Sequence, residues 1–154
     1  MSKLFEAGAR PLYVEFWDKL AVEGSAFRAK DPFFENPEGT FDFMKLAEPK
    51  NRGGGVVNFL KNLATPGFDA RQGIVKDGIL FYFKNGTARG CIPLHRPSSE
   101  ILPEIEELSN GYVFTVKTLL PRRFGDGMSC LWKIGGKTRE DAEALLEKIT
   151  KFNK

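Results

Sequence analysis

The side chains with the greatest potential for chemistry lie in one short segment. His95, the single histidine, follows Cys91 by four residues, and a thiol beside an imidazole can act as nucleophile and base. No Asn or Asp is obviously placed to orient the imidazole, and the two residues lie where a strand is expected to end. The pattern favours a buried cysteine and a surface histidine. We therefore expect no catalytic residue, although enzymatic activity as a whole stays open.

Metal and nucleotide sites are not predicted either. One histidine and two distant cysteines, Cys91 and Cys130, do not supply a standard zinc site. The Gly-Gly-Lys-Thr run at residues 135–138 resembles the end of a phosphate-binding loop, but the upstream glycine of that motif is missing. A turn followed by a helix cap explains this run. We expect no metal and no cofactor.

Charge is distributed unevenly along a chain whose net charge is +3. Residues 71–137 contain ten Lys and Arg against six Asp and Glu, and four of these acids fall within residues 100–107. Outside that acidic segment, only Asp77 and Asp126 oppose the ten basic residues. The positive charge therefore belongs to the middle of the chain.

Length and composition indicate one globular domain, residues 1–154, with 42% apolar and 28% charged residues. The first residues lack the apolar region of a secretory signal. No apolar run reaches the ~20 residues that a membrane-spanning helix needs. Both cysteines lie in apolar runs, as is typical of free thiols in a reducing compartment. We expect a cytoplasmic or nuclear protein that is neither secreted nor embedded in a membrane.

Turn signals define the elements that must position any site. Asp77-Gly78 and Asn85-Gly86 are typical of two-residue hairpins. The expected strands cover residues 71–76, 79–84, 87–92, 112–120 and 128–134, with a short strand at 40–46 as an open alternative. Helices are expected after Pro11, over 56–64, as a short acidic helix over 103–109, and after Thr138. The sequence predicts an α+β fold whose antiparallel sheet has about five strands, a three-strand meander plus a hairpin, with the helices mainly on one face.

Two-residue turns fix which side chains share a face of this sheet. Arg71, Tyr82, Lys84 and Arg89 fall on one face of the meander, opposite the face with Phe81. Lys117 and Lys133 join the basic face if the aromatic residues of the last two strands point to the helices. A β-bulge at Gly90 is the main risk to this register.

A face with charge of one sign raises the local concentration of anions. Phosphate contacts combined with base stacking on aromatic rings are typical of proteins that bind single strands. We therefore predict a non-enzymatic protein that binds single-stranded DNA or RNA. The predicted binding residues are Arg71, Tyr82, Lys84, Arg89, Lys117, Arg122, Arg123, Phe124 and Lys133.

An alternative prediction is a protein-binding inhibitor, adaptor or small structural subunit that docks on an acidic protein partner. A turn-rich stretch holds more aromatic residues than usual, and those that stay exposed would serve as interface anchors. These residues are Phe27, Phe33, Phe34, Phe41 and Phe43. The choice between DNA and RNA and the formation of a homo-oligomer stay open.

Overall fold

The computed structural model describes residues 9–46, 67–96, 98–118 and 130–154. Along this part of the chain the elements are α2 (Ala9–Glu23), the 3-10 helices Gly24–Ala26 and Pro32–Phe34, β1 (Gly39–Leu46), β2 (Phe68–Lys76), β3 (Ile79–Lys84), β4 (Thr87–Pro93), β5 (Ser99–Leu108), β6 (Gly111–Thr118), β7 (Cys130–Gly136) and α4 (Arg139–Thr150). The helix predicted over 56–64 lies outside the described residues.

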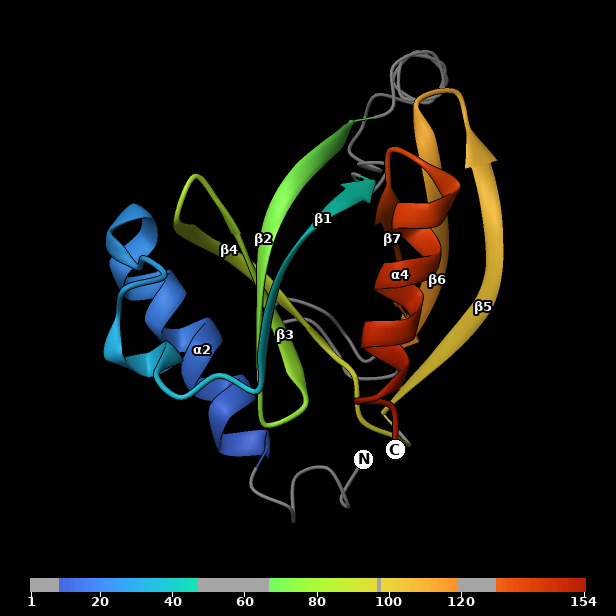
Figure 1. Cartoon of the computed structure of the whole chain (residues 1–154). Helices are drawn as coiled ribbons and strands as arrows, with labels where there is room; N and C mark the ends of the chain where they lie inside the picture. The colour runs from blue at the N-terminus through green and yellow to red at the C-terminus, as the bar shows by residue number, and fades with distance from the viewer. Residues whose placement is uncertain (1–8, 47–66, 97, 119–129) are drawn as a thin grey trace, which may run out of the picture.

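The described strands form one antiparallel sheet of seven strands in the order β4-β3-β2-β1-β7-β6-β5 (Figure 1). With α2 and α4, they make a single sheet-rich α+β domain. The predicted count of about five strands is wrong, because β1 and β5 also belong to the sheet.

The sheet bends between β1 and β7. These strands pair only at Met44 with Gly135 and at Lys45 with Ile134. Side chains from β1–β4 and from β6 and β7 pack together with α4 around one group of buried residues, which we call the inner core. Its members are Phe43, Val75, Leu80, Tyr82, Ile92, Phe114, Val116, Trp132, Ile134, Leu145 and Ile149, with Leu94 beside them.

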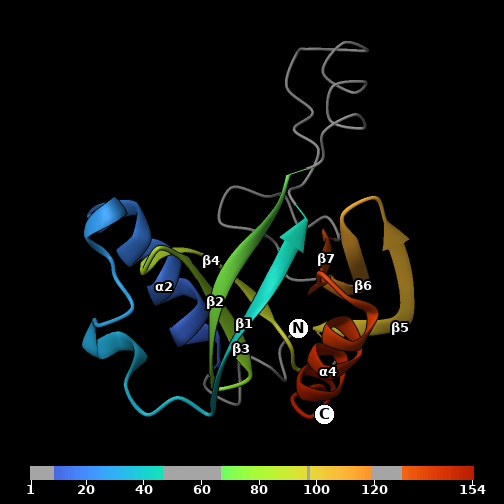
Figure 2. The same ribbon diagram turned by 45° about the horizontal axis from the view of Figure 1, so that its top comes forward.

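β3 is buried on both faces. Leu80 and Tyr82 enter the inner core, whereas Phe81 and Phe83 point to the opposite side. There α2 and residues 27–34 cover them and form a second, aromatic-rich cluster, the outer core. Figures 1 and 2 show α2 beside β2–β4 and α4 beside β5–β7. The prediction that the helices lie mainly on one face is wrong, because each face of β3 carries its own apolar set and needs its own cover.

The two hairpin turns of the meander form as predicted. Asp77 and Asn85 have φ values of 50° and 52°, and each is followed by a glycine that also has positive φ. Positive φ at both central positions is typical of the tight turns that match the twist of antiparallel strands. Val75 accordingly lies opposite Leu80, which confirms the predicted pairing of β2 and β3.

The pairing of β3 and β4 departs from the prediction near Gly90, where a β-bulge was the main risk to the predicted register. The register shifts after Tyr82, so that Gly90 rather than Arg89 lies opposite it. Beyond the shift, Cys91 pairs with Phe81 and enters the outer core. The predicted placement of Cys91 on the face of Tyr82 is therefore wrong, because the bulge exchanges the faces of every later residue in β4.

β5 occupies the segment that was predicted to be a short acidic helix. Its pairing with β6 contains a bulge between Leu102 and Glu106. Ile101 and Ile105 both pack on the inner core, because residues four apart share a face of a strand as they do of a helix. Pro103 is tolerated there because an edge strand leaves one side of its backbone unpaired. The helix prediction is wrong because this segment pairs with β6 as a strand.

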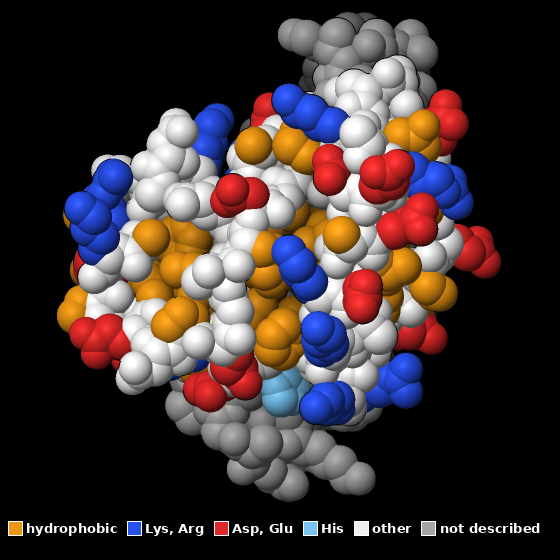
Figure 3. Space-filling model, viewed as in Figure 1, with side chains coloured by type: hydrophobic (Ala, Val, Ile, Leu, Met, Phe, Trp, Pro, Cys, Tyr) orange, Lys and Arg blue, Asp and Glu red, His pale blue; other side chains and the backbone are white. Residues whose placement is uncertain are grey.

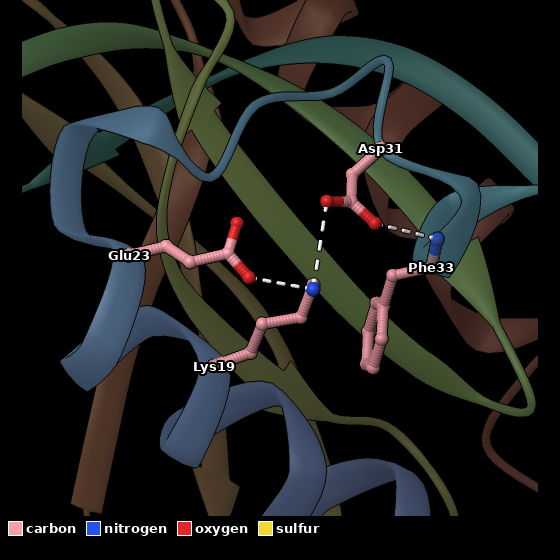
Figure 4. Close-up of polar contacts among 4 residues, drawn as sticks. All are labelled: Lys19, Glu23, Asp31 and Phe33. Carbon is pink, nitrogen blue, oxygen red and sulfur yellow. Dashed lines mark hydrogen bonds and ion pairs between the residues drawn. The ribbon is translucent and has the colours of Figure 1, made fainter.

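Polar contacts hold residues 27–34 against α2 (Figure 4). The Nζ atom of Lys19 lies 2.5 Å from Oε2 of Glu23 and 3.7 Å from Oδ2 of Asp31. The other carboxylate oxygen of Asp31 accepts a hydrogen bond of 2.9 Å from the backbone N–H of Phe33. These contacts surround the outer core, which is otherwise made of apolar and aromatic side chains.

α4 begins and packs as the sequence predicts. The Thr138 hydroxyl accepts a hydrogen bond of 3.1 Å from the backbone N–H of Asp141, which caps the helix. Ala142, Leu145 and Ile149 are buried. Among the described helices, none is both long enough and apolar enough to span a lipid bilayer.

Candidate functional site

Four of the predicted site residues come together on the inner face of the meander. Strand alternation places Arg71, Tyr82 and Lys84 on the side of the inner core. Arg89, in the bulge of β4, acts electrostatically on the Tyr82 hydroxyl, as Arg71 does. This face is covered in part by β6, β7 and α4, whereas the sequence analysis expected an open face.

Tyr82 is buried in this arrangement. Its side chain is 8% exposed, and its ring lies over Gly90. A Cβ atom at Gly90 would stand 2.4 Å from the Tyr82 hydroxyl oxygen, so only glycine fits beneath the ring. A base needs an exposed ring face for stacking. The predicted exposure of the Tyr82 ring is therefore wrong, and its assignment as a binding residue stays a prediction.

The structure adds two residues that the sequence analysis did not place in the site. The Nζ atom of Lys45 in β1 lies 5.3 Å from the centroid of the Tyr82 ring and 5.2 Å from that of the Trp132 ring. The two rings are 6.0 Å apart. The alternation of Phe41, Phe43 and Lys45 was the signal that could have placed Lys45 on this face.

Lys45, Arg71, Lys84 and Arg89 form what we call the basic rim. Lys45 and Arg71 are half-buried, and Lys84 and Arg89 are exposed. Asp69 is the cross-strand neighbour of Lys45. For Arg71, Lys84 and Arg89, no ion pair is found within the described part of the chain. The rim is therefore a local excess of positive charge.

One buried polar group beneath the rim lacks a hydrogen-bond partner among the described residues. Arg71 donates from Nη1 to the Ala70 carbonyl at 2.8 Å, but its buried Nε–H is unpaired there. Burial raises the pKa of Tyr82 above its ordinary value of 10.0, with a further rise from Cys91, while Arg71 and Arg89 oppose the rise. At neutral pH the phenol keeps its proton and can donate it to an acceptor.

The remaining predicted cations lie elsewhere. Lys117 and Lys133 alternate along their strands with inner-core residues such as Trp132. Their side chains therefore lie on the other face of the sheet and point away from the rim. Lys133 forms an ion pair with Glu106 of β5, and Lys117 stands opposite Glu100. Their inclusion in one basic face is wrong, because β5 brings carboxylates to their side of the sheet. Arg122, Arg123 and Phe124 lie outside the described residues.

The aromatic residues of the turn-rich stretch are mostly buried. Phe27, Phe34 and Phe43 are 0%, 4% and 4% exposed, and Phe33 and Phe41 are half-buried. All five belong to or pack against the two cores, with Phe27, Phe33 and Phe34 at the outer core and Phe41 and Phe43 at the inner core. Their proposed role as exposed anchors is therefore wrong for the three buried residues.

His95 and Cys91 lie in different surroundings. A Cβ atom at Gly78 would stand 1.5 Å from Nε2 of His95, so the imidazole packs on the β2–β3 turn. Cys91 is buried in the outer core. Burial raises the pKa of its thiol well above 9.0, and the neighbouring Trp17 side chain opposes that rise. Within the described residues, no group of three or more His, Cys, Asp or Glu could hold a metal ion.

The comparisons with known proteins give a distant likeness in fold. No family model and no curated protein matches the sequence. The fold is similar to the solution structure of the pleckstrin homology domain of the human KIAA0053 protein, with a TM-score of 0.46 and 13% sequence identity over 75% of this chain and 87% of that chain. At that level of similarity, the likeness transfers no site residue to this chain.

Proposed function

We propose that this chain is a non-catalytic binding module that captures a phosphate monoester on its basic rim. The observation that supports this function is the buried Arg71 Nε–H, which lacks a partner among the described residues and lies beneath a cluster of cations. Buried polar groups are usually hydrogen-bonded, so this donor is suited to an acceptor supplied by a ligand.

The charge of the rim favours a compact anion with more than one negative charge. Three of its cations, Arg71, Lys84 and Arg89, form no ion pair within the described part of the chain. A phosphate monoester carries about −1.5 to −2 charges at neutral pH and three strong acceptor oxygens. Guanidinium groups such as that of Arg71 bind these oxygens with well-matched geometry.

A nucleic-acid strand fits this arrangement less well. Single-strand binding proteins place bases on exposed aromatic rings along an electropositive groove. Here both rings of the site, Tyr82 and Trp132, are less than 10% exposed, and Lys117 and Lys133 face away from the rim. A small phosphorylated molecule and a lipid headgroup share the required chemistry, and the experiment must distinguish them.

The first experiment titrates the whole chain with glycerol 3-phosphate. Trp132 lies beside Tyr82, so its fluorescence should report binding. Arg71→Gln should weaken the affinity about 10- to 100-fold, as expected for the loss of hydrogen bonds between charged groups. Lys117→Gln is the matched control and should bind as wild type. Affinity should also fall below about pH 6, where the monoester gains a proton.

Vesicles then separate the two sources of the phosphate. Co-sedimentation with phosphatidylcholine vesicles that contain phosphatidic acid, together with weak binding of glycerol 3-phosphate, would favour a lipid headgroup. Tight binding of the soluble ester alone would favour a metabolite. The proposal fails if neither probe binds, or if Arg71→Gln binds both like wild type. Oligothymidine binding that is lost in Arg71→Gln would instead support the nucleic-acid prediction.

A further inference from the structure

A second feature, lined by none of the residues of the basic rim, is a hollow between β1 and α4. Its volume is about 350 Å³, at the lower end of the range for ligand sites. Asp42, Phe43 and Met44 of β1 form one wall, and Ala144, Leu145 and Lys148 of α4 form the other. Figure 3 shows apolar side chains gathered along this seam in the centre of the view.

The hollow exists because β1 loses its neighbour. β7 pairs with β1 at only two positions and ends at Gly136. A Cβ atom at Gly136 would stand 2.4 Å from Cβ of Asp141, so the chain turns tightly into α4. α4 then packs mainly on β5, β6 and β7. Residues Gly39–Phe43 are paired with β2 on one side and face no described strand on the other.

This free edge differs from the other two edges of the described sheet. β5 carries a bulge, Pro103 and several acids, which are common protections against pairing with another chain. The β4 edge is covered by residues 27–29, since Ala88 N–H donates to the Phe27 carbonyl at 2.8 Å and Ala29 N–H donates to the Gly86 carbonyl at 2.8 Å. β1 has no proline and no bulge. It is the described edge without protection.

We propose that an extended, uncharged and apolar segment of a partner protein adds to β1 as a strand, beside Gly39–Phe43, with side chains directed into the hollow. Unpaired backbone N–H and C=O groups of a strand edge recognise extended chain in this way. The lining contains two acids and two lysines, namely Asp42, Asp141, Lys137 and Lys148. This balance favours a segment without strong net charge, in contrast to the basic rim.

The test uses a displayed library of random linear peptides selected against the whole chain. Enriched peptides should alternate apolar residues. In hydrogen exchange, they should protect backbone amides within Gly39–Phe43. Ala144→Gln, which places a longer side chain at the exposed wall of the hollow, should weaken their binding by about tenfold or more. Glu147→Gln, on an exposed position of α4 outside the hollow, is the matched control and should bind normally.

Four outcomes would overturn this inference. They are the absence of any enriched peptide, protection of another strand, equal binding by the Ala144→Gln variant, and protection of Gly39–Phe43 already in the free chain. Concentration-dependent protection with a dimer in size-exclusion chromatography would assign the edge to a second copy instead. Because Arg71→Gln should leave peptide binding unchanged, failure here is distinguishable from failure of the phosphate proposal.

Discussion

The inner core is bordered by polar groups at two margins, and the two margins differ in whether these groups are hydrogen-bonded. At the margin near the C-terminus, the Asn153 amide donates to the carbonyls of Leu94 at 2.7 Å and Ser99 at 3.0 Å, and its oxygen accepts from Nε of Arg96 at 3.0 Å. At the basic rim, the Arg71 Nε–H has no such partner within the described residues.

The difference separates a structural margin from a candidate binding margin. An unmade hydrogen bond of a buried group costs about 1–3 kcal/mol. The Asn153 side chain satisfies the carbonyls of Leu94 and Ser99, whereas the nearby Ser98 hydroxyl has no partner among the described residues. At the rim, the Arg71 Nε–H is left unsatisfied in the described part of the chain, where a ligand can complete it. We therefore expect substitutions near the C-terminus to change stability, and substitutions at the rim to change affinity.

The largest effect is expected in the apolar layer that both margins share. Leu145 is 4% exposed in the inner core, so Leu145→Ala should lower the free energy of unfolding by about 2–5 kcal/mol. Urea unfolding measures this loss. Leu146→Ala, at a half-buried position on the same helix, should cost less. A loss below about 1 kcal/mol for Leu145→Ala would show that α4 is peripheral to the core.

Asn153→Ala tests the satisfied margin. It leaves the Leu94 and Ser99 carbonyls without their amide donor, and should cost about 1–3 kcal/mol. Binding of glycerol 3-phosphate to the folded fraction should not change. Full stability of this variant would contradict the distinction between the two margins. So would a folded variant that no longer binds glycerol 3-phosphate.

Tyr82→Phe tests the unsatisfied margin. Because the variant keeps the ring in the inner core and loses only the hydroxyl, it should change the free energy of unfolding by less than about 1 kcal/mol. Affinity for the phosphate ester should nevertheless fall, since a donor to the ligand is lost. Thermal unfolding and titration of the same sample give both values. A stability loss as large as that of Leu145→Ala would contradict this interpretation.

The smallest expected effect is an alkaline loss of stability. Burial holds the pKa of Tyr82 above 10.0 and that of Cys91 above 9.0 in the folded chain. The unfolded chain releases these protons first, so this stability is present below pH 9.0 and declines as pH rises through the raised values. Tyr82→Phe should therefore flatten the decline above pH 10.0, and Cys91→Ala should flatten the part that begins near pH 9.0. Urea unfolding at several alkaline pH values provides the measurement, and identical slopes in all three proteins would contradict it.

The local parts of the fold could be predicted from the sequence because short motifs determine them. The turns and the β2–β3 register were predicted from Asp77-Gly78 and Asn85-Gly86. The start of α4 was predicted from Thr138. Arg71, Tyr82 and Lys84 were correctly assigned to one face for the same reason. The prediction that failed was the exposure of that face, because exposure depends on strands distant in sequence that fold over it.

Two further errors have the same kind of cause. Residues 103–109 were predicted to form an acidic helix, and only the pairing of β5 with β6 reveals a strand. The bulge at Gly90 was foreseen as a risk, but the sequence of β4 alone does not determine whether the register shifts there. Val75 and Leu80, apolar residues on the supposedly open face, were the signal that this face also packs against something.

The narrow β1–β7 contact has a consequence for how the chain folds. The β2–β3–β4 hairpins join neighbours in sequence and can form early, because short loops lose little entropy on closure. The pairs Met44–Gly135 and Lys45–Ile134 join positions about ninety residues apart and must wait for both parts of the sheet. Closure of the inner core is thus a late kinetic event. An intermediate with a finished meander would still expose Leu80 and Tyr82, the residues that the second half later covers.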